Sequence, residues 1–491
     1  MLCLLPRRAR IIRCGMRISG WLNRIFRFNR RAAREPLPQK ADVMARTPSQ
    51  PPAEPQGFFE RTRFEGTLSG HGASVPTGFY ASIDPLGVLR LELDRIPFSR
   101  EAYALRVDQR PGTNVDLIAL EGRSEAGHLF RSNSFHIASF GHGSEPGAEL
   151  SYQGDCQDAE LELPRRSGRE NRGDARVWLV RQFRTFRHMT RDTELGRMAI
   201  GGPRQDREAQ EPNGYIAVYR PEGDTNESWW RDSERLLTHV ARVLSFACDT
   251  YFRPVIEERY EGDRATVRVA RQGRASGPFM APFHELHMDP IFACACETYF
   301  TRRDAVEDLD AAIRWLTAPV AYDESRLINA MSALENILDR CGLDEVDLFM
   351  RPNAFRRIAS QVRDLLASRD VPEGMARKVP ELNRRPLNEK ILALVAALGI
   401  VTNDFPEGWL RAVIGQRNTI VHTGVSRDFD DQGPDTLDYT IWAREIVTRI
   451  ILERLGFDGA YRSWLHHDEQ LHFPECITMQ DWVARREADA G

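Results

Sequence analysis

The sequence predicts an α+β fold with at least two domains, in which a β-rich part precedes an all-α bundle. The chain has 491 residues, and this length exceeds what a single compact core usually contains. From residue 58 to 300, short runs of alternating apolar and polar residues are bounded by Gly, Pro and Asn, a pattern typical of strands. From residue 301 to 491, apolar residues recur at helical spacing instead.

The N-terminal segment, residues 1–57, combines a basic arm with a Pro-rich linker. Residues 1–46 carry eleven Arg and one Lys against two acidic residues, a net charge of +10, which leaves −14 for the rest. Arginines alternate with apolar residues in RISGWLNRIFRFNRR, as in segments that bind nucleic acid or an anionic membrane. The alternatives are a transit peptide and a true start at Met16 or Met44, so we expect a disordered or mis-started segment.

The region 58–300 is expected to be a β-rich domain. LRLELD (89–94) places its leucines on one side, and VWLV (177–180) and GYIAVY (214–219) have the same character. One amphipathic helix is expected over residues 228–249, where it would close or cross the sheet.

Six helices are predicted after residue 300, at 304–316, 324–341, 354–366, 387–399, 407–424 and 438–456. Gly399, Gly424 and Gly456 follow three of the helix ends, as expected of C-terminal caps. Together the helices predict a bundle.

The composition fits a cytoplasmic protein. Hydrophobic residues make up 42% of the chain and charged residues 28%, as in ordinary globular proteins. No apolar run approaches the roughly 18 residues of a membrane span, and the apolar start CLLP is too short for a secretory signal. Eight cysteines without framework spacing predict reduced thiols.

Arg417 occupies the middle of an apolar helical stripe. On an ideal helix its apolar neighbours within about 60° are Val413, Ile414, Ile420 and Val421. An unpaired guanidinium buried there would be very unfavourable. Glu335 interrupts the stripe of helix 324–341 in the same way, so we expect either an Arg417–Glu335 pair or a stripe that faces a cleft or another subunit. A purely structural ion pair, or a glutamate that reaches water at a helix end, would also explain the pattern.

His422 adds a second reactive side chain to this helix. It lies five residues after Arg417, so the two point about 140° apart and are separated by about 7.5 Å along the axis. Two copies of the helix meeting about a symmetry axis would bring both groups into one cleft. Arginine can stabilise a charge-rich phosphoryl transition state, and histidine can transfer protons near neutral pH. The combination suits cleavage of RNA without a metal.

These residues resemble a known signature. Arg417, Asn418, three further residues and His422 match the Arg-polar-x-x-x-His motif of HEPN ribonucleases. The helix RLINAMSALENIL (326–338) and the segment IGQRNTIVHTG (414–424) are similar to the ApeA-like HEPN subfamily, in which a β-rich N-terminal domain precedes the HEPN-like bundle. The resemblance covers residues 300–456 and, more loosely, 58–290.

The resemblance implies a homodimeric, metal-independent endoribonuclease of anti-phage abortive infection. Arg417 and His422 would be catalytic, Asn418 would orient the site and Glu335 would support Arg417. The products would carry 2′,3′-cyclic phosphate and 5′-OH ends, and no cofactor would be required for catalysis. The expected partners are RNA, with tRNA as one target, and a phage-derived trigger such as a protein, sensed by the β-rich domain.

The sequence leaves two alternative functions open. The bundle could be a catalytically silent module that dimerises or binds a partner, with Arg417 as an interface anchor. The basic N-terminal arm could instead make the protein a nucleic-acid-binding regulator.

A structural zinc site is a further hypothesis. The ligands, of types that zinc accepts, would be His284, His287, Cys294 and Cys296 in HELHMDPIFACAC. Their spacing fits no standard finger, and the alternative is a loop followed by a buried strand, IFACAC, with inert thiols. A second histidine-rich stretch, WLHHDEQLHFPEC (464–476), has polar and acidic neighbours that predict a solvated tail.

Overall fold

The computed structural model describes residues 59–105, 118–142, 149–164, 173–185, 187–202, 211–212, 214–270, 279–340, 342, 344–369, 371–426 and 433–490. The basic arm and linker expected over residues 1–57 lie outside this part of the chain. None of the described helices is long and apolar enough to cross a membrane.

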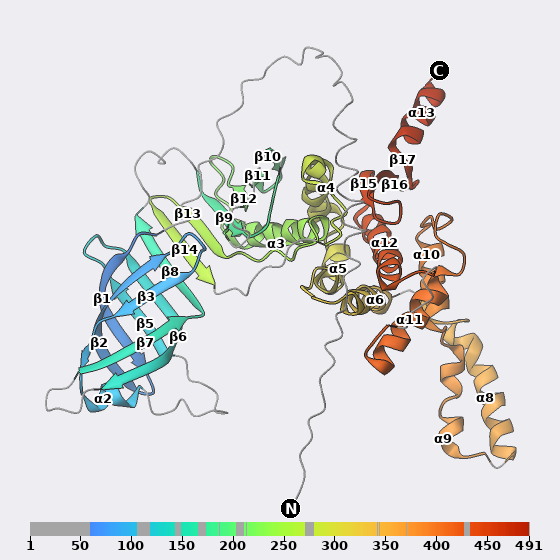
Figure 1. Ribbon diagram of the computed structural model, residues 1–491, viewed down its shortest axis with the longest axis horizontal. Coiled ribbons are helices and arrows are strands. Elements are labelled where there is room, and N and C mark those ends of the chain that lie inside the picture. The colour runs from blue at the N-terminus through green and yellow to red at the C-terminus, as the bar shows by residue number, and fades with distance from the viewer. Residues whose placement is uncertain are drawn as a thin grey trace, which may run out of the picture. The chain divides into compact units, whose positions relative to one another are not determined.

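The described N-terminal residues contain a 14-stranded antiparallel sheet (Figure 1). Its main path runs in the order β10-β11-β12-β9-β13-β14-β8-β6-β5-β1-β2-β3, and β7 pairs with both β6 and β4. The sheet curls, because β3 also lies against β7. The strands are β1 Thr62–Gly70, β2 Ala73–Ile83, β3 Leu89–Leu93, β4 Ile96–Pro97, β5 Ile118–Arg123, β6 Leu129–His142, β7 Glu149–Cys156, β8 Asp158–Pro164, β9 Ala175–Val180, β10 Met189–Thr193, β11 Gly196–Gly201, β12 Gly214–Tyr219, β13 Ile256–Glu261 and β14 Arg264–Ala270.

Two of the described helices, α2 and α3, lie between strands of the sheet in the sequence, and the other helices follow its last strand. The helices are α2 Arg100–Ala104, α3 Trp229–Ala247, η1 Glu285–His287, α4 Met288–Thr301, α5 Arg303–Leu316, α6 Asp323–Arg340, α7 Asp344–Asp347, α8 Pro352–Ser368, α9 Glu373–Ala376, η2 Val379–Asn383, α10 Leu387–Ala397, α11 Trp409–Thr423, α12 Thr436–Leu455 and α13 Met479–Ala490. The six helices predicted after residue 300 are confirmed as α5, α6, α8, α10, α11 and α12. An α+β architecture with an antiparallel sheet followed by a helical region is therefore confirmed.

Two expectations about local structure were wrong. The C-terminal part is not all-α, because β15 Gly459–Ser463, β16 Glu469–Phe473 and β17 Ile477–Thr478 form a small antiparallel sheet. Leu471 and Phe473 of the segment expected to be a solvated tail are buried. Their alternation is not apparent in the sequence because their neighbours are polar. The run IFACAC lies in α4 and is not a strand, since a short apolar run fits either period.

Strand β9 contributes to two hydrophobic cores. Ala175, Val177 and Leu179 belong to the core of the curled sheet, whereas Trp178 and Val180 belong to a second core. This second core extends through α3 and α4 into α5, α6, α11 and α12. The domain boundary expected at residue 300 therefore falls inside one continuous core.

Candidate active site

Helix α11 carries the motif and is anchored by its apolar face. Trp409, Leu410, Val413 and Ile420 are buried, and the helix contacts α6, α10 and α12. It ends at Gly424, whose φ of 79° is left-handed and whose N–H donates to the carbonyl of Ile420 at 2.8 Å. A residue with a Cβ is strained in this conformation, so the glycine fixes where the helix stops.

Arg417 and Glu335 form the ion pair that the sequence predicted. The distance from Arg417 Nη2 to Glu335 Oε1 is 2.9 Å, and the two side chains are 29% and 36% exposed. Arg417 Nη1 also donates to Asn418 Oδ1 at 3.2 Å. A pair this exposed adds little to stability, roughly 0–1 kcal/mol, so its main effect is to orient the guanidinium at the surface.

His422 lies in the last turn of α11 and is exposed. The structure brings Arg417, Asn418 and Glu335 together, but within one chain it does not bring His422 to them. The His422 imidazole has no hydrogen bond or ion pair with any residue that the structure describes. As the helical geometry predicts, a single copy does not place the imidazole beside the guanidinium.

Apolar side chains surround this helix end without cover. Val421 and Val425 are 53% and 61% exposed, and Tyr322 is 71% exposed. Ser426, just beyond α11, donates to Glu324 Oε1 at 3.2 Å, which ties the end of α11 to the first turn of α6. The exposed apolar surface therefore lies at the same end of α11 as His422.

The four residues of the zinc hypothesis do not converge. Within the described part of the chain, no three His, Cys, Asp or Glu side chains are grouped closely enough to hold a metal. Cys294 and Cys296 are two residues apart on α4, so they point about 160° from each other. Burial raises the pKa of Cys294 to about 11 and that of Cys296 to about 12, so both thiols stay protonated. His284 Nδ1 instead accepts from the N–H of Leu286 at 3.2 Å.

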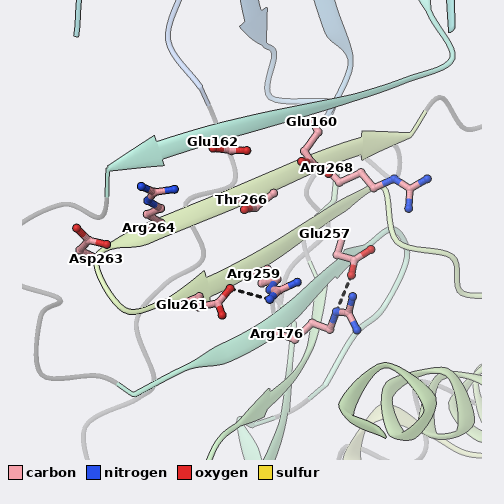
Figure 2. A pocket seen from close by; sticks show the side chains of 10 residues that line it. All are labelled: Glu160, Glu162, Arg176, Glu257, Arg259, Glu261, Asp263, Arg264, Thr266 and Arg268. Carbon is pink, nitrogen blue, oxygen red and sulfur yellow. Dashed lines mark hydrogen bonds and ion pairs between the residues drawn. The ribbon is translucent and has the colours of Figure 1, made fainter. Parts of the chain in front are cut away.

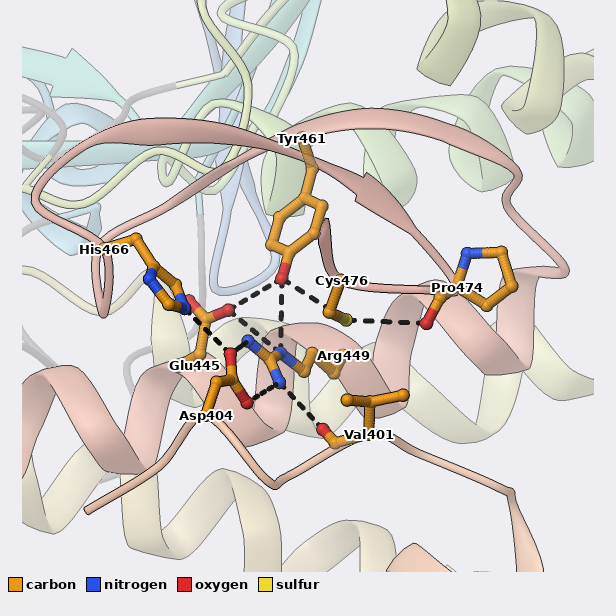
Figure 3. A network of polar contacts seen from close by, with 8 residues as sticks. All are labelled: Val401, Asp404, Glu445, Arg449, Tyr461, His466, Pro474 and Cys476. Atoms are coloured by element: carbon orange, nitrogen blue, oxygen red, sulfur yellow. Dashed lines mark hydrogen bonds and ion pairs between the residues drawn. The ribbon is translucent and has the colours of Figure 1, made fainter. Parts of the chain in front are cut away.

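A buried network around Arg449 was not foreseen from the sequence (Figure 3). Arg449 is fully buried on α12. At 2.6 to 3.2 Å it donates to Asp404, Glu445, the Val401 carbonyl and the Tyr461 hydroxyl. The only sequence signal is the apolar setting of the arginine in IVTRIIL. The bonds to Val401 and Asp404 hold the segment before α11 in place. The guanidinium is buried, so it is not accessible to a substrate.

The network lowers the pKa of Asp404. Burial alone would raise its pKa, but the hydrogen bonds and charge of Arg449, with a hydrogen bond from His466 at 2.8 Å, outweigh burial and lower it. The carboxylate therefore ties α12 and the small C-terminal sheet to the segment that leads into α11.

Among the hollows elsewhere in the described chain, two are lined by paired charges. One, of about 570 Å³, lies over β8, β9, β13 and β14 (Figure 2) and is lined by Glu160, Glu162, Arg176, Glu257, Arg259, Glu261, Asp263, Arg264, Thr266 and Arg268. Its charges pair with one another, for example Arg176 with Glu257 at 2.7 Å and Arg259 with Glu261 at 2.6 Å. Such pairing is typical of a sheet face that is exposed to solvent. The other, of about 240 Å³, contains the buried Arg444–Asp249 pair.

Comparison with protein families, curated proteins and solved structures finds no match to this chain. Of the regions described above, only the end of α11 combines an oriented, accessible arginine with an accessible histidine.

Proposed function

We propose that the protein is a metal-independent endoribonuclease of the HEPN type, which acts as a homodimer in the cytoplasm. The observation that carries the proposal is the ion pair between Arg417 and Glu335. Arg417 lies five residues before His422, which is exposed at the end of α11. The pair holds the guanidinium in one orientation and leaves it accessible. An oriented guanidinium matches the geometry of a phosphate.

The chemistry uses proton transfer and charge stabilisation. His422 removes the proton of a ribose 2′-OH, the 2′ oxygen attacks the adjacent phosphorus, and the bond from phosphorus to the 5′ oxygen breaks. The leaving oxygen takes up a proton from an imidazolium. Arg417 binds the non-bridging oxygens as negative charge accumulates on them, and Asn418 holds Arg417. The products carry 2′,3′-cyclic phosphate and 5′-OH ends.

A dimer is required because one helix directs the two groups about 140° apart. In a symmetric pair the same surface of each copy contacts the other, so Arg417 of one copy can face His422 of its partner. Val421 and Val425, both more than half exposed, provide apolar area for that contact. The cleft then opens along the symmetry axis, where a single-stranded, splayed nucleotide fits best.

The biological setting follows from the resemblance. In the ApeA-like arrangement, the N-terminal β-rich region senses a phage component, such as a protein, and the helical region cleaves RNA, with tRNA as one target. Cleavage of host RNA would then stop growth before phage are released.

Growth and RNA cleavage together test the proposal. Expression in bacteria should be toxic when the trigger is present, and Arg417→Ala or His422→Ala should relieve the toxicity by lowering cleavage about 10²- to 10⁴-fold. Arg411→Ala, at an exposed position of the same helix, is the matched control and should stay toxic. RNA from these cells, and RNA treated with purified protein in EDTA, should carry new 5′-OH ends. Cleavage that survives both substitutions contradicts the proposal.

The exposed Val421 and Val425 also favour a second candidate, a catalytically silent dimerisation module. This module would dimerise as well as the enzyme but would produce no 5′-OH ends under any condition. A nucleic-acid-binding regulator that depends on residues 1–46 would lose its function on their deletion, whereas the nuclease should keep its cleavage.

A further inference from the structure

The segment between α7 and α10 forms a helical hairpin that contributes almost nothing to the core. This basic hairpin, residues 351–385, comprises α8, α9 and η2. Its residues in α8 are exposed or half-buried apart from Ala359, and α8 packs against α9 and η2. Its base is closed by Asn383, whose carbonyl accepts from Phe349 N–H at 2.9 Å and whose side chain donates to the Met350 carbonyl at 2.8 Å.

The basic hairpin is strongly positive. It contains nine basic and four acidic residues, a net charge of +5 in a chain whose net charge is −4. Seven of the nine make no ion pair with any residue in the described ranges: Arg351, Arg356, Arg357, Arg363, Arg369, Lys378 and Arg384. All seven are exposed. Many surface arginines elsewhere in the described chain have acidic partners, for example Arg63, Arg90 and Arg131, whereas here seven exposed basic residues without one are gathered in a single hairpin.

The arrangement of these charges suits a polyanion. Arg356 and Arg363 are seven residues apart on α8, so they share a face and stand about 10 Å apart along the axis. Apolar side chains lie between the basic ones, since Ile358, Leu365, Met375 and Leu382 are 38% to 63% exposed. A positive surface interrupted by apolar side chains is typical of proteins that bind single-stranded nucleic acid without sequence preference.

The base of the hairpin connects to the elements of the proposed site. It continues into α10, which contacts α6 and α11, the helices that carry Glu335 and Arg417. A strand bound along the hairpin would therefore be tethered to the part of the molecule that is proposed to cut it.

We propose that the basic hairpin binds the phosphate backbone of single-stranded RNA and holds the substrate near α11; this rests on the proposed ribonuclease function. Binding is electrostatic and independent of sequence, because exposed guanidinium groups recognise phosphates and not base edges. The hairpin contributes affinity, whereas Arg417 and His422 carry the chemistry.

Binding is measured separately from cleavage. The full chain with His422→Ala is titrated into a fluorescent oligouridylate, and anisotropy is recorded at several salt concentrations. Neutralising three hairpin residues, Arg356→Gln, Arg363→Gln and Lys378→Gln, should lower affinity about 100-fold at ~0.1 M salt and reduce the slope of log K against log[salt] by about 2. A second set, Arg351→Gln, Arg357→Gln and Arg369→Gln, should behave alike.

The matched control neutralises exposed arginines outside the hairpin, Arg100→Gln, Arg123→Gln and Arg187→Gln, and should keep the parent affinity and slope. Unchanged affinity in both hairpin sets, or an equal loss in the control set, overturns the proposal. The outcome does not depend on cleavage. A hairpin that binds RNA in a protein that never cuts it would refute the ribonuclease function and leave the binding surface established.

Discussion

At the residue scale, the ion pair between Arg417 and Glu335 explains why a charged group interrupts an apolar stripe. The stripe runs out at the surface, where both side chains are about one-third exposed. Neither charge is therefore sealed in the core, and the large cost of burying a lone guanidinium does not arise. The pair could be predicted because both residues violate helical periodicity.

Glu335→Gln should separate the effect of Glu335 on the orientation of Arg417 from its effect on the stability of the protein. The substitution removes the charge that holds Arg417 but keeps the shape, so the free energy of unfolding should change by less than about 1 kcal/mol. Cleavage should fall about 10- to 100-fold, because a displaced guanidinium no longer meets the phosphate. Asp339→Asn, at an exposed position of the same helix, should change neither quantity. Wild-type cleavage rates in Glu335→Gln would remove Glu335 from the site.

The lowered pKa of Asp404 predicts how the free energy of unfolding depends on pH. Its folded pKa is lowered, so the stability that it contributes is present above the ordinary carboxyl pKa of about 3.9 and is lost as the pH falls through the folded pKa. Asp404→Asn should lower the free energy of unfolding by about 3 kcal/mol at pH 7, because Arg449 loses a charged partner in a buried setting. Urea unfolding at pH 7 and near pH 2.5 checks this, since the difference should shrink in acid. A constant difference would contradict it.

At the scale of elements, α11 contains one glycine and is followed by another, and the two have opposite requirements. Gly415 lies mid-helix, and a Cβ added there would meet no atom within 4 Å, whereas Gly424 adopts a φ of 79°. The first conformation suits any residue and the second favours glycine. The helix therefore has a replaceable glycine and one that sets its length.

The two glycines should respond differently to alanine. Gly415→Ala should raise the free energy of unfolding by up to about 1 kcal/mol, because alanine favours the helix. Gly424→Ala should lower it by about 1 kcal/mol, because the left-handed conformation is strained, and should also reduce cleavage by displacing His422. Thermal unfolding and RNA cleavage measured on both variants check the prediction. Equal effects would show that the cap does not position His422.

The elements could be predicted to different extents. Helices α5, α6, α8, α10, α11 and α12 follow from apolar residues at helical spacing, and glycines follow the ends of α10, α11 and α12. The sheet at residues 459–478 could not be predicted, because its strands are short and its buried positions, such as Leu471, stand among charged residues. The Arg449 network was also missed, since its partner Asp404 is 45 residues away in sequence and only the tertiary fold unites them.

At the scale of the whole molecule, the proposed site would form only between two copies of the chain. The geometry of α11 predicts this, because the guanidinium and the imidazole diverge within one copy. The sequence could indicate the residues and the need for a second copy. It could not indicate which surface would join two copies, because that surface depends on which apolar side chains stay exposed after folding.

Mixing two inactive variants tests this arrangement. Arg417→Ala and His422→Ala protomers, denatured together and refolded, should form mixed dimers with one intact site, made from His422 of the first variant and Arg417 of the second. With random mixing, about a quarter of the wild-type activity should return. Each variant refolded alone should stay inactive. Failure of the mixture to cut RNA, although mass spectrometry shows mixed dimers, would refute a site shared in this way.

Strand β9 limits which insertions and deletions the sequence can tolerate. Its alternate residues fill two separate cores, so inserting or deleting one residue would turn every side chain to the opposite side and spoil both interiors together. Chimeras joined at residue 300 should also fail, since the cut divides an interior that both halves build. Insertions and deletions are therefore expected in the loops of the sheet, where a change of length disturbs neither core.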